Sequence, residues 1–174
     1  MYTKFQILGT LDTHANNLRL ASLLRVLARS SDLEVEFRKA IGLRRPEVFE
    51  PSLGLLADKP KFIDAVDQMY FAIVRTAVTE ALDLTREYCE TTGQSAILKR
   101  QSWFRVFRII RNALNHNFRL EFNPTDRKLL PLTWKTICLT NAQDGKELTQ
   151  KMFPVDVAID WLTELDDFVS EGIK

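Results

Sequence analysis

The longest helical pattern in the chain covers residues 61–91. Apolar side chains recur there three or four residues apart over about eight turns, the spacing that places them on one face of a helix. These side chains are Phe62, Val66, Met69, Ile73, Ala77, Ala81, Leu84 and Tyr88. Gly93 follows as a suitable C-terminal stop. The pattern therefore predicts a long helix that packs through this face, and nothing in it points to a cofactor.

Shorter patterns predict the other helices. Residues 13–29 form one, with Thr13 as its N-cap and an apolar series at Leu20, Leu23, Leu24 and Leu27. Residues 33–41 suggest a further piece, and three prolines make 43–60 an irregular connection. Helices are also expected over 95–117 and 154–170, the last with Pro154 in its first turn.

Residues 132–140 change to an alternating pattern that is typical of a strand. Turn residues follow at 141–145, and residues 146–153 could pair back as a hairpin partner. The expected fold class is therefore mainly α: a bundle of four to six helices, with a short β-hairpin inserted before the C-terminal helix. The length of 174 residues suggests one domain over 1–174.

Composition excludes several classes of protein. The 24 basic and 23 acidic residues leave a net charge of +1, which argues against a uniformly basic nucleic-acid coat. Two His and two Cys are too few for a multi-His or Cys-rich zinc site, and we expect no metal and no cofactor. Cys89 and Cys138 are expected as reduced thiols, although one bridge is possible. No run is apolar enough for a signal peptide or a membrane helix, so a cytoplasmic protein is expected.

The helix expected over 95–117 carries the chemistry. On a helical wheel its apolar residues fill one wide arc, and its polar residues fill the other. The polar residues are Arg105, Arg108, Arg111, Asn112, Asn115, His116 and Arg119. From Thr91 to Leu120 there are six Lys or Arg and no acid. Such a strip favours an anion, and guanidinium groups are suited to phosphate.

His116 closes this strip and shares a face with Asn112, while Arg111 and Asn115 lie on the adjacent row. Together they could converge on one phosphodiester. Imidazole can move a proton near neutral pH, guanidinium can stabilise a phosphorane, and a carboxamide can orient either group. RNA supplies its own nucleophile, the 2′-hydroxyl, so neither a metal nor a covalent residue is required.

The segment from Arg111 to His116 reads RNxxxH, which resembles the motif of the HEPN superfamily of all-helical ribonuclease domains. The resemblance implies a HEPN-like domain that cleaves single-stranded RNA without metal. Arg111 and His116 would be catalytic with Asn112 as a helper, and Arg105, Arg108, Asn115 and Arg119 would bind RNA. It also implies a homodimer and a role as a toxin or antiphage, abortive-infection-type effector. A nucleotidyltransferase-like antitoxin is a possible partner.

Several alternatives stay open. His116 could be a helix-capping residue, and the chain could be a non-catalytic helical dimer that binds RNA, a nucleotide or a protein. The arginine strip could be a solvated face. It could also pair with the last helix, where residues 154–172 carry six acids and no Lys or Arg. His14 is expected at the surface, and Trp103, Trp134 and Trp161 as core anchors.

Overall fold

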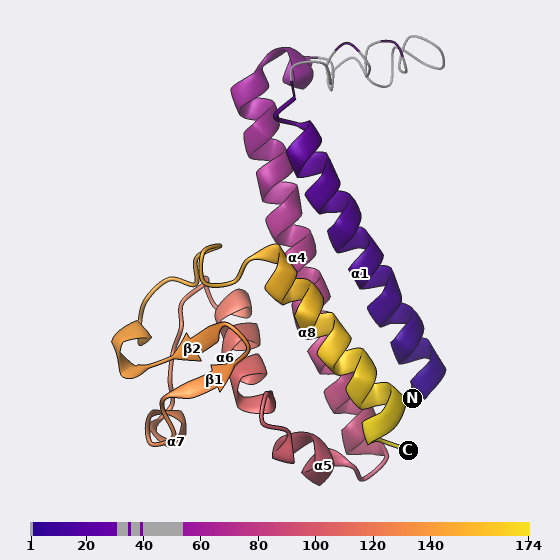
Figure 1. The fold of residues 1–174 in the computed structure, drawn as a ribbon, viewed down its shortest axis with the longest axis vertical. Coiled ribbons are helices and arrows are strands. Elements are labelled where there is room, and N and C mark those ends of the chain that lie inside the picture. The colour runs from indigo at the N-terminus through magenta and orange to yellow at the C-terminus, as the bar shows by residue number, and fades with distance from the viewer. Residues whose placement is uncertain (1, 31–34, 36–38, 40–53) are drawn as a thin grey trace. The chain divides into compact units, whose positions relative to one another are not determined.

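A computed structural model describes residues 2–30, 35, 39 and 54–174 of the chain. It confirms a mainly helical protein with a small antiparallel hairpin before the C-terminal helix (Figure 1). The elements are α1 (Lys4–Leu27), α4 (Lys59–Thr91), α5 (Ser95–Arg100), α6 (Phe104–Asn115), α7 (Pro124–Arg127), β1 (Leu132–Trp134), β2 (Ile137–Leu139), the 3₁₀ turn η1 (Asn141–Gln143), α8 (Val155–Asp167) and the π-helical turn η2 (Phe168–Gly172). The helical piece expected over 33–41 lies mostly outside the described residues, as does the expected connection up to residue 53.

The chain divides into two compact units. One contains residues 1–16 and 74–174, and the other contains residues 17–73. In the first unit, Lys4 Nζ of α1 donates to the carbonyl oxygens of Ser170 and Ile173, at 2.7 and 2.9 Å. In the second unit, Asp67 of α4 accepts from Arg25 Nε at 2.6 Å and from Arg29 Nη2 at 2.8 Å. That the whole chain forms one domain remains a prediction.

Helix α4 confirms the longest sequence pattern. It ends at Thr91, and Gly93 follows with a positive φ of 72°, a backbone conformation that glycine adopts without strain. Most of the predicted apolar series is buried or half-buried, although Met69 is exposed.

Helix α1 differs from its prediction at both its start and its apolar face. It begins at Lys4, so Thr13 is no N-cap but an interior residue whose hydroxyl donates to the Gly9 carbonyl oxygen at 2.8 Å. Leu20 and Leu23 are 65% and 54% exposed, and the buried positions nearby include Leu18 and Ala21. Residues 18–28 are apolar on several faces at once, and helical spacing alone does not select the face that packs.

The helix expected over 95–117 is two helices. α5 ends at Arg100, Gln101 has an extended backbone with ψ of 133°, and α6 begins at Phe104. The intervening segment contains neither glycine nor proline, so the break has no local sequence signal. It accompanies the burial of Trp103, whose ring packs edge-on against Phe168 at 5.5 Å between centroids.

The hairpin forms within the stretch that was expected to be a single strand. β1 and β2 pair antiparallel in the register Leu132↔Leu139 and Trp134↔Ile137, with a two-residue turn between them. Because Trp134 and Ile137 are paired across the turn, the buried face passes from even to odd positions there: Trp134, Ile137 and Leu139 are buried, and Cys138 is exposed. Residues 146–153 were expected to pair with this strand segment, but residues 146–148 do not pair with the hairpin. They meet residues 118–120 instead, through hydrogen bonds between Leu120 N and Lys146 O and between Leu148 N and Phe118 O.

An aromatic cluster joins α6, the hairpin and α8. Phe107 stacks on Trp161 with 3.5 Å between centroids and 7° between ring planes. Trp103 and Trp134 each lie 4.6 Å from Phe107, so all three tryptophans are core residues as predicted. Helix α8 runs close to its predicted range, with Pro154 as its N-cap, one position before the first turn. The cluster fixes the apolar face of α6, and thereby the direction of its polar face.

Candidate functional site

Helix α6 has the two faces that its sequence predicts. Its apolar residues are buried, namely Phe104, Val106, Phe107, Ile109, Ile110, Ala113 and Leu114. The arginines and asparagines of the motif therefore lie on the opposite side, toward α4, α7 and solvent. The structure also supplies what the local sequence lacks, because acids from other elements reach this side.

Arg111 is held against α4. Its Nη2 donates to Asp83 Oδ2 at 2.6 Å, and its Nη1 donates to the Asn112 side-chain oxygen at 3.3 Å. The side chains of Arg111 and Asp83 are 24% and 41% exposed, so water still reaches this ion pair. Arg111 Nε is buried and has no hydrogen-bond partner among the described residues. The guanidinium is thus oriented by two neighbours and its charge is partly offset.

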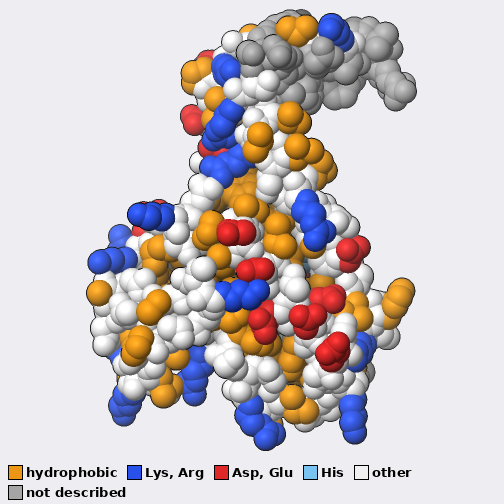
Figure 2. All heavy atoms as spheres, viewed as in Figure 1, with side chains coloured by type: hydrophobic (Ala, Val, Ile, Leu, Met, Phe, Trp, Pro, Cys, Tyr) orange, Lys and Arg blue, Asp and Glu red, His pale blue; other side chains and the backbone are white. Residues whose placement is uncertain are grey.

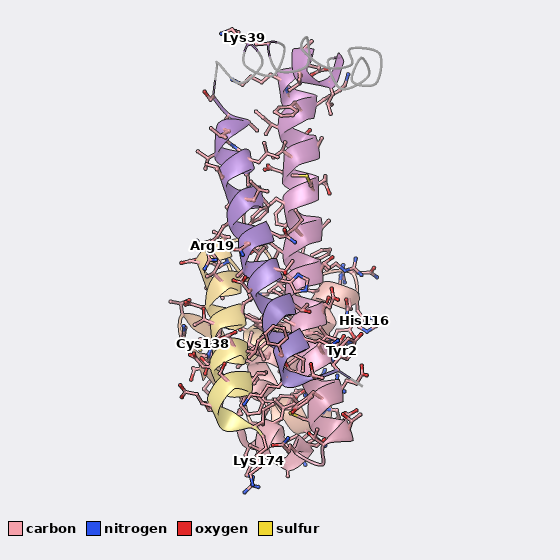
Figure 3. The ribbon with its side chains drawn as sticks, turned by 90° about the vertical axis from the view of Figure 1, so that its right-hand side faces the viewer. Tyr2, Arg19, Lys39, His116, Cys138 and Lys174 are labelled. Carbon is pink, nitrogen blue, oxygen red and sulfur yellow. The ribbon has the colours of Figure 1, made fainter. Side chains whose placement is uncertain are left out.

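His116 lies just past the end of α6. It is the C-cap residue, and its backbone N–H donates to the carbonyl oxygens of Asn112 and Ala113. Asn117 and Phe118 then take positive φ values of 57° and 56°, so the helix does not continue to 117 as expected. The imidazole is exposed and projects outward (Figure 3). The imidazole is therefore open to solvent and to a ligand. The helix-capping role considered from the sequence belongs to the backbone N–H of His116 and not to its side chain.

Arg108 is engaged by an acid that the sequence did not suggest. Its Nη2 donates to Asp126 Oδ1, and Asp126 is buried. Asp126 belongs to the short helix α7, and its backbone N–H donates to the Asn123 side-chain oxygen at 2.8 Å. A buried carboxylate requires a partner, so Arg108 has a structural role whatever else it binds.

The predicted RNA-binding residues separate onto two sides of α6. Arg105 and Arg108 line one groove of about 580 Å³, together with Asn112, the predicted catalytic helper. Asn115 lines a second groove of about 500 Å³, together with Asp83. Arg119 lies beyond the helix, where its backbone forms an isolated antiparallel β-bridge with Glu147. The structure therefore places Arg111 and Asn112 in direct contact, and distributes the other predicted residues around them.

His14 is buried, which makes the expectation of a surface position wrong. Its Nε2 lies 3.3 Å from Glu80 Oε2, within ion-pair distance but without hydrogen-bond alignment. Glu80 lines the same groove as Asn115. The sequence gives no sign of this pair, because His14 and Glu80 come from α1 and α4, far apart in the chain.

The acids of the last helix meet other partners. Asp160 pairs with Lys135 at 3.1 Å, and Glu164 accepts from Trp134 Nε1 at 3.1 Å. Figure 2 shows acidic side chains gathered over α8. Burial raises the pKa of Asp166, and the neighbouring charges of Asp167 and Asp12 raise it further. Within one chain, Arg108 and Arg111 therefore pair with α7 and α4 and not with the last helix.

Searches within the described residues find no helix that could span a membrane, and no group of three or more His, Cys, Asp or Glu placed to hold a metal ion. Comparisons of the chain with protein-family models, with curated proteins and with solved structures find no match. The likeness to the HEPN superfamily therefore rests on the motif residues of α6.

Proposed function

We propose that this protein is a metal-independent endoribonuclease that cleaves single-stranded RNA, with its centre at the C-terminal end of α6. The observation that carries the proposal is a guanidinium and an amide in contact, Arg111 and Asn112, one turn before an exposed imidazole at 116. An imidazole can transfer a proton, and a guanidinium can stabilise charge, in phosphodiester cleavage by a neighbouring hydroxyl.

In the proposed reaction, the RNA 2′-oxygen attacks the adjacent phosphorus as its proton passes to a base. The bond from phosphorus to the 5′-oxygen breaks, and that oxygen takes up a proton. The products are a 2′,3′-cyclic phosphate and a 5′-hydroxyl. His116 serves as base or acid, Arg111 stabilises the phosphorane, and Asn112 or Asn115 orients the groups. Arg105, Arg108 and Arg119 hold the RNA backbone.

The biological role proposed with this activity follows from the family resemblance. It is a cytoplasmic toxin or antiphage effector, acting as a homodimer and restrained by a nucleotidyltransferase-like antitoxin. Light scattering of the purified protein measures the dimer directly, and a monomeric mass at all concentrations contradicts that part of the proposal.

The test is cleavage of an unstructured RNA in EDTA by the native chain, by His116→Ala and by Lys151→Ala. Lys151 is exposed and lies outside the motif, so its variant controls for a surface change. Loss of a general acid–base group lowers the rate by roughly 100-fold to 10,000-fold. We expect that loss for His116→Ala only. No cleavage by the native chain, or equal cleavage by His116→Ala, refutes the nuclease.

One observation favours a second candidate, a non-catalytic helical dimer that binds RNA, a nucleotide or a protein. Asp83 offsets the charge of Arg111, and this weakens the electrostatic help that Arg111 can give to a phosphorane. This candidate predicts that RNA stays intact and that its binding weakens steeply as salt is raised.

A further inference from the structure

The groove beside Arg105 has the charge of an anion site. Its lining residues come from α4, α5, α6 and the α7 region, and these four helices are labelled in Figure 1. The cations in the lining are Arg86, Lys99, Arg105 and Arg108. Two carboxylates, Glu90 and Asp126, also line it. Four positive and two negative charges leave a net charge of +2. We refer to it as the Lys99 groove.

The four cations differ in how firmly they are engaged. Arg108 is held by buried Asp126, and Arg86 lies between Asp83 and Glu90 at the longer distances of 3.6 and 3.8 Å. Lys99 and Arg105 are exposed, and the described part of the chain places no carboxylate within ion-pair distance of either. These two cations are therefore available to an incoming anion without breaking an existing pair.

The rest of the lining suits a nucleotide. Leu98 and Phe104, which are 3% and 8% exposed, form the apolar part of the lining, and Asn123 and Thr125 add polar groups. A volume of about 580 Å³ lies within the range of small-molecule sites, roughly 300–1,000 Å³. A cationic wall beside an apolar patch lets a phosphate of single-stranded nucleic acid pair with the cations while its base contacts the apolar patch.

Asn112 connects this groove to the motif. Its side chain lines the groove, and its oxygen accepts from Arg111 Nη1 at 3.3 Å. A nucleotide bound in this groove would therefore lie beside Asn112, which is the chain neighbour and hydrogen-bond partner of the proposed catalytic Arg111. The opposite groove, lined by Asn115, carries three carboxylates, Glu80, Asp83 and Glu87, against one cation, Arg75, and its net charge of −2 would repel a phosphate.

We propose that the Lys99 groove binds one nucleotide of a single-stranded RNA, with the phosphate between Lys99 and Arg105 and the base against Leu98 and Phe104. The identity of the ligand rests on the proposed function, whereas the groove and its charge do not. The site adds Lys99 to the residues expected to hold RNA, and it commits the strand to the Asn112 side of α6.

The experiment measures fluorescence anisotropy of a labelled oligouridine dodecamer in EDTA, with every variant built on His116→Ala so that the RNA stays intact. One protein carries Lys99→Glu and Arg105→Glu. Its matched control carries Lys146→Glu and Lys151→Glu, the same charge change at two exposed lysines outside the groove. Circular dichroism and thermal melting confirm that both proteins remain folded.

We expect the groove variant to weaken binding at least tenfold at 0.15 M salt, and the control less than about threefold. The slope of log K against log salt should fall by roughly 0.7 in the groove variant, because the one phosphate between Lys99 and Arg105 loses its contact and each phosphate contact on a single strand contributes about 0.7. An abasic oligonucleotide should bind the parent protein more weakly than oligouridine, because it has no base to contact Leu98 and Phe104.

Equal weakening by both charge-reversed proteins, unchanged binding by the groove variant, or no RNA binding by the parent each overturns the proposal. Equal affinity for the abasic strand overturns the base contact. The nuclease proposal and the groove proposal can be refuted independently of each other. Binding that depends on Lys99 and Arg105 without cleavage by the native chain refutes the nuclease alone. Cleavage that is unaffected when Lys99→Glu and Arg105→Glu are introduced into the native chain, with His116 present, refutes the groove alone.

Discussion

Replacing Phe107 with alanine tests whether the aromatic cluster holds α6 in place. The ring is completely buried, stacked on Trp161 with 3.5 Å between centroids, and lies 4.6 Å from both Trp103 and Trp134. Its removal leaves a cavity bounded by three tryptophans, whose large rings cannot collapse into the space without leaving their own positions.

The cost follows from burial and from the ring contacts. Substituting alanine for a buried phenylalanine costs about 3–5 kcal/mol of unfolding free energy. Aromatic pairs add about 0.5–1.5 kcal/mol each beyond the buried area, and Phe107 loses three of them. We therefore expect the upper part of that range, about 4–5 kcal/mol. For a chain of this size the melting temperature should fall by roughly 10–20 °C.

Urea unfolding followed by tryptophan fluorescence measures this free energy, and circular dichroism gives the melting temperature. Phe5→Ala is the matched control, because the same side chain is 84% exposed there and its removal should cost less than about 0.5 kcal/mol. A loss below about 2 kcal/mol for Phe107→Ala, or a similar loss for both variants, refutes the assignment of this cluster as the support of α6.

Two further predictions concern Arg111 and the cysteines. A double-mutant cycle of Asp83→Asn and Arg111→Gln should give a coupling of about 0.2–1 kcal/mol, because both side chains are partly exposed, and zero coupling contradicts the pair. Cys138 is exposed and should react with a thiol reagent at once. Burial, helped by the charge of Glu90, raises the pKa of Cys89 to about 11, so this thiol should react only in denaturant. Two rapidly reacting thiols in the native protein contradict the burial of Cys89.

The elements predicted well from the sequence are those whose local residue pattern is compatible with only one structure. α4 has a single apolar face and a glycine stop, and its end is where the pattern placed it. α1 has apolar residues on several faces, and only its packing shows that Leu18 is buried and Leu20 is not. The break before α6 is a tertiary effect, since residues 101–103 carry no helix-breaking residue.

The candidate site was predictable only within its own helix. The polar face of α6 follows from helical spacing, but the acids that meet it are 28 residues away for Asp83 and 18 residues away for Asp126. Pairs on one helix are three or four residues apart, so an acid-free segment says nothing about acids brought by other elements. For this reason the strip was predicted to be more positive than it is.

The three arginines of α6 show why equal residues at equal spacing acquire different roles. A step of three residues turns about 300° around the helix, so Arg105, Arg108 and Arg111 fan across its polar face at intervals of about 60°. Each therefore faces a different neighbour: the Lys99 groove for Arg105, Asp126 of α7 for Arg108, and Asp83 of α4 for Arg111. Only Arg105 keeps its charge unopposed among the described residues. At the Lys99 groove an RNA strand should thus show the salt dependence of the one phosphate held between Lys99 and Arg105, because Arg108 and Arg111 already have carboxylate partners.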